Sequence, residues 1–279
     1  MLKIDSVGLT ISAVPLLNNI SIDCPRGSVT ALMGPNGAGK TSLLKVISGE
    51  HKASQGRVEI NRQSREDWKP AEIAQFMAVL PQSSTLEFAF TSEEVVALGR
   101  TPHATGTVRD AEIITAALAK VDASYLAQRS FVQLSGGEKQ RVQLARVLAQ
   151  IWDHCEYEGD GEGEGEGEGE GEGEGEGGAP TDGILLLDEP SAAFDLAHQL
   201  MLIDIVQQIS ARGVTVVMVM HDLNLAAKCA DQMVFMNCGH CTAVGTVTEL
   251  LTPELIKKVF SVDAEVITHP VQGTPMVVV

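Results

Sequence analysis

The sequence predicts an α/β protein whose core is a mostly parallel sheet with helices on both faces. Short apolar runs, such as Val29 to Met33 and Ile184 to Leu187, have the length and composition of buried parallel strands. Segments with helical patterns separate these runs along the chain, which is the element order of a doubly wound sheet. Polar residues follow directly where the runs end, at the edge of such a sheet where ligands bind.

The first 30 residues differ from this core because they are typical of strands and turns. Pro25-Arg26-Gly27 has the composition of a turn and comes directly before the first apolar run. We therefore expect an N-terminal antiparallel β region that leads into the parallel core.

Residues 34 to 42, GPNGAGKTS, are a complete phosphate-binding loop between a strand and the helical run 43 to 48. The glycines allow a tight turn whose N–H groups point at phosphate oxygens. Lys40 supplies a charge for the β- and γ-phosphates, and the hydroxyls of Thr41 and Ser42 suit magnesium and the next phosphate. The predicted ligands are Gly34, Pro35, Asn36, Gly37, Ala38, Gly39, Lys40, Thr41 and Ser42. The loop predicts a P-loop NTPase core of the RecA-like type, although it fits a nucleotide kinase, a GTPase or a recombinase equally well.

A small helical subdomain is expected to be inserted in this core at 91 to 152. Thr91 to Glu94 has capping-box spacing ahead of an apolar run. A second helix over 109 to 121 places Ile113, Ala117 and Val121 in register on one face. We therefore divide the chain into an α/β core, 1 to 90 with 183 to 279, and this subdomain.

Residues 134 to 141, LSGGEKQR, begin the last helix of the subdomain, which is predicted to run to about Trp152. Ser135 and Glu138 have the spacing of a capping box. The two glycines between them leave the first amides uncovered, so that an anion can bind at the helix tip. The box alone fits an ordinary capped helix equally well.

Two further strands end in residues suited to phosphate chemistry. Asp188, after Ile184 to Leu187, would hold the shell of a magnesium ion, and Glu189 would polarise the attacking water as general base. His221 follows the apolar run Val214 to Met220 and can reach a γ-phosphate. The alternatives are solvated acids at a strand end and a structural histidine. The loop upstream favours the catalytic interpretation.

The pairing of GPNGAGKTS with LSGGE resembles the ATP-binding subunits of ABC transporters, whose signature motif is LSGGQ or LSGGE. The resemblance implies ATP and Mg²⁺ as cofactors and a homodimer with two shared ATP sites. In that family the signature, here Ser135, Gly136, Gly137 and Glu138, closes over the γ-phosphate that the other subunit holds. Gln82, in LPQ, matches the glutamine that senses magnesium, so the implied metal set is Thr41, Gln82 and Asp188. Asp195, retained after the paired acids, completes the implied nucleotide site.

Three longer segments resemble the haemin-importer branch of the iron-chelate and cobalamin importer family. They are LPQSSTLEFAFTSEEVVALGRTPH at 80 to 103, RVQLARVLAQIW at 141 to 152 and DLAHQ at 195 to 199. The resemblance implies an ATPase at the cytoplasmic face of the membrane that drives haem import through two permease subunits and, indirectly, a substrate-binding protein. A ferric siderophore or cobalamin importer, a soluble ABC-type ATPase and a P-loop kinase are the alternatives.

The sequence departs from that family at two places. Many members stack adenine on an aromatic residue upstream of the phosphate loop, but residues 8 to 15 contain none. In the segment Ser191-Ala192-Ala193-Phe194-Asp195, the final four residues stand where the family usually has Ser-Ala-Leu-Asp, so that Ala192 lacks a hydroxyl for bonding across the dimer. These departures affect two properties implied by the resemblance, the recognition of the adenine base and the communication between the two ATP sites.

The composition of 279 residues, 44% of them hydrophobic, fits one or two compact domains. No apolar run approaches the roughly 18 residues that span a bilayer, and the start lacks a secretory pattern, so membrane contact is expected through a protein partner. The five cysteines suit a reducing compartment. Cys238 to Cys241 could hold a metal, but a second ligand pair is missing and a hairpin turn is the favoured interpretation.

The net charge of −17 comes mainly from residues 153 to 182, which contain thirteen acids and neither Lys nor Arg. The rest of the chain carries only −4, which does not favour nucleic acid as a partner. Most of 153 to 182 is an alternating Gly-Glu repeat that cannot bury apolar surface, and we expect it to be disordered. Its ends should lie on the side of the sheet opposite the nucleotide. Neutral repeat expansion is the favoured interpretation, with calcium binding or a regulatory contact as alternatives.

Overall fold

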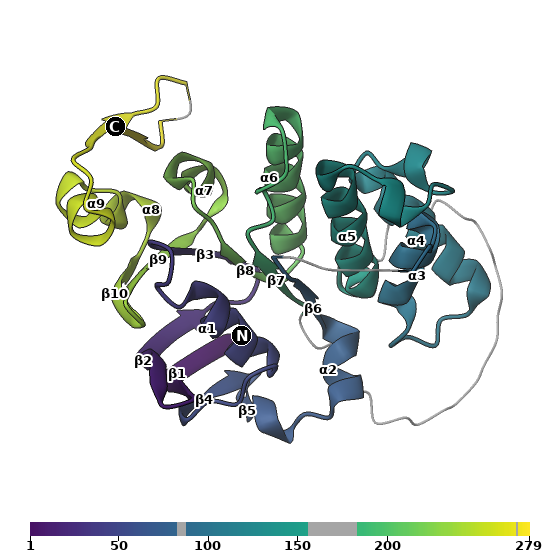
Figure 1. Ribbon diagram of the computed structural model, residues 1–279, viewed down its shortest axis with the longest axis horizontal. Helices are drawn as coiled ribbons and strands as arrows, with labels where there is room; N and C mark the ends of the chain where they lie inside the picture. Colours follow the sequence, from purple (N-terminus) through teal and green to yellow (C-terminus); the bar gives the residue numbers. More distant parts are fainter. Residues whose placement is uncertain (83–87, 156–182, 272) are drawn as a thin grey trace, which may run out of the picture.

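The computed structural model describes residues 1–82, 88–155, 183–271 and 273–279. Its centre is a six-stranded sheet in the order β10-β9-β3-β8-β7-β6, in which β10 alone of these strands runs antiparallel to its neighbour (Figure 1). Buried β-branched and aliphatic side chains fill the inner strands, as the short apolar runs predicted. The strands are β3 (Val29–Met33), β6 (Met77–Leu80), β7 (Ile184–Asp188), β8 (Thr215–Val219), β9 (Gln232–Asn237) and β10 (His240–Gly245).

A four-stranded antiparallel sheet, in the order β2-β1-β4-β5, covers one side of the molecule. Helix α1 (Lys40–Ser48) lies between this sheet and the central sheet, so that one hydrophobic cluster contains side chains from all three layers. The predicted N-terminal antiparallel region is therefore confirmed, and it holds the helix that begins at the glycine-rich loop. The strands are β1 (Leu2–Ile11), β2 (Val14–Cys24), β4 (Gln55–Ile60) and β5 (Gln63–Ser64).

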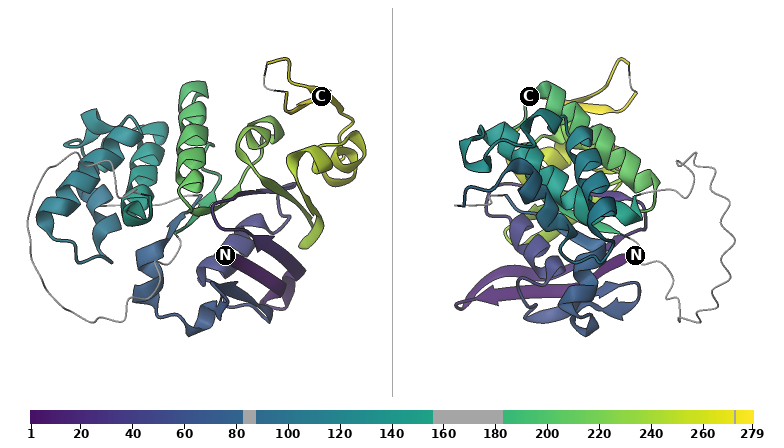
Figure 2. Two further views of the ribbon diagram at one scale, coloured as in Figure 1. Left: turned by 180° about the vertical axis from the view of Figure 1, so that it is seen from behind. Right: turned by 90° about the vertical axis from the view of Figure 1, so that its right-hand side faces the viewer.

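Helices on the other face of the central sheet belong to a second, larger hydrophobic cluster. They are α6 (Leu196–Ala211), α7 (Leu223–Cys229), α8 (Val247–Leu250) and α9 (Pro253–Phe260), while α2 (Pro70–Phe76) leads directly into β6. The chain ends in the hairpin β11 (Glu265–Thr268) and β12 (Pro275–Val278), which lies beside α7 (Figure 2). The side chain of Asn224 on α7 bonds both backbone groups of Val277, at 3.0 and 2.7 Å.

The helical subdomain consists of α3 (Ser92–Ala97), α4 (Thr107–Lys120) and α5 (Gly136–Gln150), which lie together at one end of the central sheet (Figure 1). Both predicted capping boxes are present: Thr91 accepts from the Glu94 amide and Ser135 from the Glu138 amide. Ile113 and Ala117 on the predicted face of α4 are buried, and Val121 is buried directly after the helix ends. No helix within the described ranges is long and apolar enough to cross a membrane.

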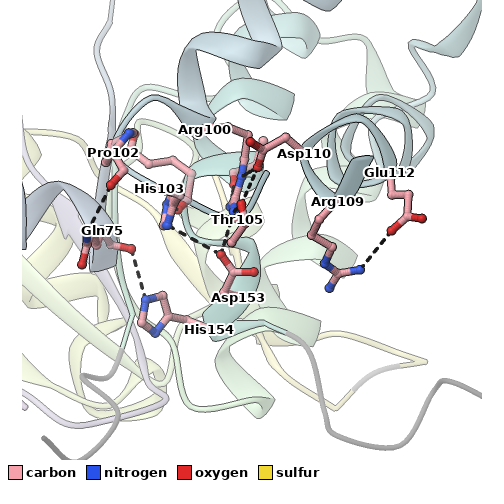
Figure 3. Close-up of polar contacts among 12 residues, drawn as sticks. Gln75, Arg100, Pro102, His103, Thr105, Arg109, Asp110, Glu112, Asp153 and His154 are labelled. Carbon is pink, nitrogen blue, oxygen red and sulfur yellow. Dashed lines mark hydrogen bonds and ion pairs between the residues drawn. The ribbon is translucent and has the colours of Figure 1, made fainter. Parts of the chain in front are cut away.

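A buried guanidinium anchors the loop between α3 and α4 (Figure 3). The Arg100 side chain is 3% exposed and forms ion pairs of 2.9 Å with Asp110 at the start of α4 and with Asp153 after α5. Its third nitrogen donates to the carbonyl of Ala149 at the end of α5. Arg100 therefore joins three parts of the helical subdomain at one point.

Further polar contacts join this subdomain to α2 of the core (Figure 3). Gln75 on α2 donates to the carbonyl of Pro102, and a ring nitrogen of His154 lies 3.1 Å from the carbonyl of Gln75. Gln150 donates to the carbonyls of Ala74 and Met77. These bonds hold the end of α5 against the edge of the sheet.

The predicted disordered segment 153 to 182 falls almost entirely on 156–182, outside the described residues. Its first three residues differ from the prediction, because Asp153 and His154 complete a 3₁₀ turn after α5 (Trp152–His154) and Cys155 is buried. The chain after it resumes at Gly183, where an added Cβ would lie only 2.9 Å from the Cβ of His154. The two described ends are thus neighbours, at the edge of the sheet where β7 begins and remote from Asp188 at its other end.

Candidate functional site

The glycine-rich loop 34–39 takes a conformation that side chains would prevent. Gly34 has a φ of 151°, and a Cβ there would lie 2.1 Å from the carbonyl oxygen of Met236. Gly39 has a φ of 98°, and its Cβ would lie 2.8 Å from the side chain of Leu17. The backbone therefore passes close to both the central sheet and β2 before α1 begins at Lys40, so that the first amides of α1 face the cavity described below.

Lys40 lies inside this loop with 6% of its surface exposed. Its ammonium group donates to the carbonyls of Gly34 at 2.7 Å and Pro35 at 3.0 Å. Burial lowers the pKa of Lys40, while Glu189 and Asp188 act in the opposite direction. The loop thus holds a desolvated cation beside two acids, which suits a ligand that carries several negative charges.

Asp188 ends β7 and is 4% exposed. It accepts a hydrogen bond of 3.2 Å from the hydroxyl of Thr41, the second residue of α1. Burial raises the pKa of Asp188, and the bond from Thr41 acts against this. A buried carboxylate that accepts a hydrogen bond from a hydroxyl offers hard oxygen ligands, so these two residues fit a magnesium ion. Gln82, an exposed residue after β6, lines the same cavity.

Glu189 and His221 meet across the ends of two neighbouring strands, β7 and β8. The Nε2 atom of His221 lies 2.7 Å from the Oε1 atom of Glu189. The Glu189 side chain is 18% exposed and that of His221 is 45% exposed. Glu189 has a φ of 51°, in the left-handed region that non-glycine residues rarely adopt. A carboxylate held by an imidazole at the mouth of a phosphate loop can orient a water and accept its proton.

Lys40, Thr41 and Glu189 line one cavity of about 490 Å³, which Asp188 and His221 join through their bonds to Thr41 and Glu189. It brings together predicted residues from three separate parts of the chain, although Gly34 and Pro35 of the loop do not line it, and it adds two segments that sequence reasoning missed. Pro15 and Leu16 come from β2, and Cys238 and Gly239 come from the β9–β10 turn. The lining is Pro15, Leu16, Asn36, Gly37, Ala38, Gly39, Lys40, Thr41, Ser42, Gln82, Glu189, Cys238 and Gly239.

The β9–β10 turn joins the wall of the cavity through backbone bonds. Gly239 donates to the carbonyl of Ala38 at 3.1 Å and accepts from the amide of Asn18 at 2.8 Å. The predicted hairpin turn at Cys238 is confirmed, but its position beside the phosphate loop follows from the sheet order, in which β9 pairs with β3. The described residues hold no group of three potential metal ligands at this turn or elsewhere.

The signature residues lie outside this cavity. Ser135 and Gly136 are exposed at the start of α5, and Gly137 and Glu138 are partly exposed. Asp195 is also exposed and caps α6 through the amide of His198. One chain therefore brings the phosphate loop, Gln82 and Glu189 into one site, which Asp188 and His221 join through direct bonds. It leaves Ser135 to Glu138 and Asp195 on the outer surface.

Comparison with known proteins agrees with this geometry. Residues 17–152 match the family model described as ABC transporter. The chain is 42% identical over its full length to the hemin import ATP-binding protein HmuV of Pseudomonas fluorescens strain Pf-5, covering 99% of that protein. It is 43% identical over 92% of its length to the protein of that name from Plesiomonas shigelloides, covering 94% of it.

Solved structures share the fold at lower identity. An ATP-binding cassette of an ABC transporter in its ADP conformation has a TM-score of 0.73 at 21% identity, with 94% of this chain and 98% of that chain covered. A dimeric bacterial ABC transporter cassette has a TM-score of 0.71 at 22% identity, with 88% and 99% covered. From the full-length relatives and the site geometry together, this chain belongs to the family of ABC transporter ATP-binding proteins.

Proposed function

We propose that this chain is the ATP-hydrolysing subunit of an ABC import system and drives haem uptake through a membrane permease. The observation that carries the ATPase activity is the bonded pair Glu189 and His221 at the mouth of the phosphate loop. The haem substrate is supported by full-length relatives named as hemin import ATP-binding proteins.

Each group of residues at the cavity has a separate role in ATP hydrolysis. The loop amides bind the β- and γ-phosphates, and the Lys40 ammonium exchanges its two carbonyl partners for phosphate oxygens. Glu189 orients the attacking water and accepts its proton, while His221 holds the Glu189 carboxylate in place and faces the γ-phosphate. Thr41, Asp188 and Gln82 would hold magnesium, which neutralises charge between the phosphates when bound.

A second copy of the chain would complete the site. The exposed signature residues lie outside the cavity of their own chain. The N-terminus of α5, with its uncovered amides, is suited to an anion presented by a partner. We infer a homodimer in which each signature covers the γ-phosphate bound by the other chain and Asp195 lies close to the shared boundary.

Glu189→Gln separates this shared-site arrangement from a monomeric ATPase. Glutamine keeps the shape of the side chain but cannot accept the proton, so ATP should stay bound and the dimer should stay closed. We expect a nucleotide-dependent dimer by size-exclusion chromatography with ATP and magnesium. Lys40→Ala, which removes the phosphate-binding cation, is the matched control and should remain monomeric. A monomeric Glu189→Gln protein with bound ATP would contradict the shared site.

The helical subdomain is the surface proposed to face the permease. The anchored loop 101–106 and α4 border a cavity of about 410 Å³ on this subdomain, lined in part by Glu93, Arg100 and His103. The chain would thus lie on the cytoplasmic face of the membrane as a peripheral subunit, with two permease subunits above the dimer and a substrate-binding protein beyond them.

Growth tests distinguish the possible substrates. A host strain that lacks this chain would be grown on haemin as the sole iron source, on a ferric siderophore and under a cobalamin requirement. Loss of growth on haemin alone, restored by the wild-type chain but not by Glu189→Gln, supports the proposed substrate. Loss on the siderophore or under the cobalamin requirement would assign the chain to that importer instead.

A further inference from the structure

His198, on the first turn of α6, lies between two carboxylates from different parts of the molecule. Its Nδ1 atom is 2.7 Å from the Oδ1 atom of Asp195, which also accepts from the His198 backbone amide at 2.9 Å. Its Nε2 atom is 4.0 Å from the Oδ2 atom of Asp122, in the turn after α4. The ring is 24% exposed, and it lies beside the ring of Phe194, with 6.0 Å between centroids.

The chemistry of these contacts fixes what the imidazole does. An ionised carboxylate only accepts hydrogen bonds, so the Nδ1 atom that faces Asp195 carries a proton, and the Nε2 atom attracts the Asp122 carboxylate in the imidazolium form, in which it carries a proton as well. The same carboxylate receives two N–H groups from one residue, and both lower the pKa of Asp195. The Asp195 side chain is therefore held in one orientation although 68% of it is exposed.

Asp122 carries the connection into the helical subdomain. It has a φ of 51°, and its backbone carbonyl accepts from the guanidinium of Arg141 on α5, whose side chain is 6% exposed. The same guanidinium lies 3.7 Å from the Asp122 carboxylate and donates to the hydroxyl of Tyr125 at 2.8 Å. Arg141 is six residues beyond the signature serine on the same helix.

The segment before α6 touches the same helix directly. A Cβ on Gly137 would lie 3.0 Å from the carbonyl oxygen of Ala193, and Gln140 donates to the carbonyl of Pro190 at 3.4 Å. The start of α5 and the segment 190–195 are thus adjacent in one chain. The start of α5 and the segment 190–195 are therefore joined at two points, once through the backbone contact at Gly137 and once through His198. These two contacts limit the movement of one part relative to the other.

We propose that His198 is a positioning residue that orients Asp195 and ties it, through Asp122 and Arg141, to the helix that bears the signature. The inference rests on the proposed shared ATP site. Its consequence is that Asp195 and the signature residues, which are both expected at the dimer boundary, move as one body. His198 does not line the nucleotide cavity, so it acts on turnover and not on ATP binding in the ground state.

Steady-state ATPase assays of the full chain test this role. A hydrogen bond to a charged group contributes enough that losing it should lower kcat about tenfold in His198→Ala, with the KM for ATP within about twofold of wild type. His198→Asn can keep a donor near the Nδ1 position but is too short to reach Asp122, so kcat should recover partly. Asp204→Ala, at an exposed position of α6, is the matched control and should leave kcat unchanged.

A double-mutant cycle isolates the link to the subdomain. Asp122→Asn and His198→Asn break the same contact, so the double variant should lose no more activity than the more affected single variant. Independent losses that multiply would overturn the link, and a His198→Ala kcat within twofold of wild type would overturn the positioning role. Because Asp122→Asn changes an exposed side chain, it tests the link even where His198→Ala lowers the melting temperature. Failure of Glu189→Gln to dimerise would instead count against the shared site itself.

Discussion

Within the part of the chain that the structure describes, the carboxylate of Asp188 is buried without a charged partner in hydrogen-bond contact, which makes it a source of instability as well as a proposed ligand. Burial raises its pKa, so the folded chain binds its proton more tightly than the unfolded chain does. The ionised form therefore opposes folding at neutral pH, and this penalty is relieved as the pH falls through the raised pKa.

Asp188→Asn should consequently raise the melting temperature of the nucleotide-free protein by roughly 2 °C at neutral pH while abolishing ATP turnover. The gain should shrink in acidic buffer, where the wild-type acid is already protonated. Thermal unfolding at two pH values measures both effects, and Asp204→Asn on the surface of α6 is the control. A lower melting temperature for Asp188→Asn at neutral pH would contradict the argument.

Cys238 offers a second test at a single residue, because it is the exposed cysteine on the cavity wall. Burial raises the pKa of Cys24 to about 11 and that of Cys229 to about 12, so both thiols should react slowly. N-ethylmaleimide should therefore label Cys238 first, and ATP with magnesium should slow this reaction at least about fivefold by occupying the cavity. Mass spectrometry of wild type and Cys238→Ser checks the site, and equal labelling with and without ATP would show that nucleotide lies away from the turn.

At the scale of single residues, the sequence predicted those whose chemistry is indicated by a local motif. The phosphate loop, Asp188 and Glu189 were recognisable because glycine spacing and paired acids have a mechanism. Pro15, Leu16 and Cys238 were not, because aliphatic and thiol side chains in a β region carry no phosphate chemistry. Their place in the cavity depends on which strands become neighbours in the sheet. This strand order cannot be predicted from the local patterns of a single sequence.

At the scale of elements, the loop between α3 and α4 is anchored by one side chain, that of Arg100. Arg100→Ala would leave Asp110 and Asp153 close together without their shared cation, and the carbonyl of Ala149 without its donor. Since both acids are partly exposed, we expect a loss of roughly 2 to 3 kcal/mol in the free energy of unfolding. Urea unfolding followed by circular dichroism measures it.

Arg109→Ala is the matched control for that experiment. Arg109 is 42% exposed and forms an ion pair of 3.6 Å with Glu112 on the surface of α4. Its removal should cost less than about 1 kcal/mol. Equal losses for the two variants would mean that the buried network around Arg100 does not stabilise the subdomain beyond an ordinary surface charge.

Elements with strong local signals were predicted with nearly correct bounds. The apolar runs became β3 and β7, and both capping boxes begin helices at the expected residue. The predicted end of α5 at about Trp152 lies two residues beyond the last residue of the regular helix, Gln150. The Gln150 side chain bonds to Ala74 and Met77, which are distant in sequence and gave no local signal. The hairpin of β11 and β12 had no prediction, since its short exposed strands depend on contact with α7.

For the whole molecule, the adjacency of His154 and Gly183 predicts tolerance of the acidic segment between them. Deletion of 158 to 178 should leave ATPase activity within about twofold, because the described chain at both ends is fixed by its own contacts. A scrambled segment of equal length and charge is the control for composition. A collapse of activity with the melting temperature unchanged would indicate a regulatory contact or ion binding there.

The overall arrangement of layers could be predicted from the local sequence, whereas the position of the signature residues outside the nucleotide cavity could not. Sheet class follows from strand length and element order, which are local properties. The separation of Ser135 and Asp195 from the cavity is a property of the folded surface. It became an expectation only through resemblance to a family.

The neighbouring positions of His154 and Gly183 also make this junction useful as a site for inserting another domain. A compact reporter domain inserted there would leave and re-enter the chain at nearly one point, so its attachment would place little strain on β7 or α5. It would project from the edge of the sheet opposite the nucleotide. Fluorescent or affinity modules inserted at this junction would allow single complexes to be counted, immobilised or imaged while the nucleotide cavity remains accessible.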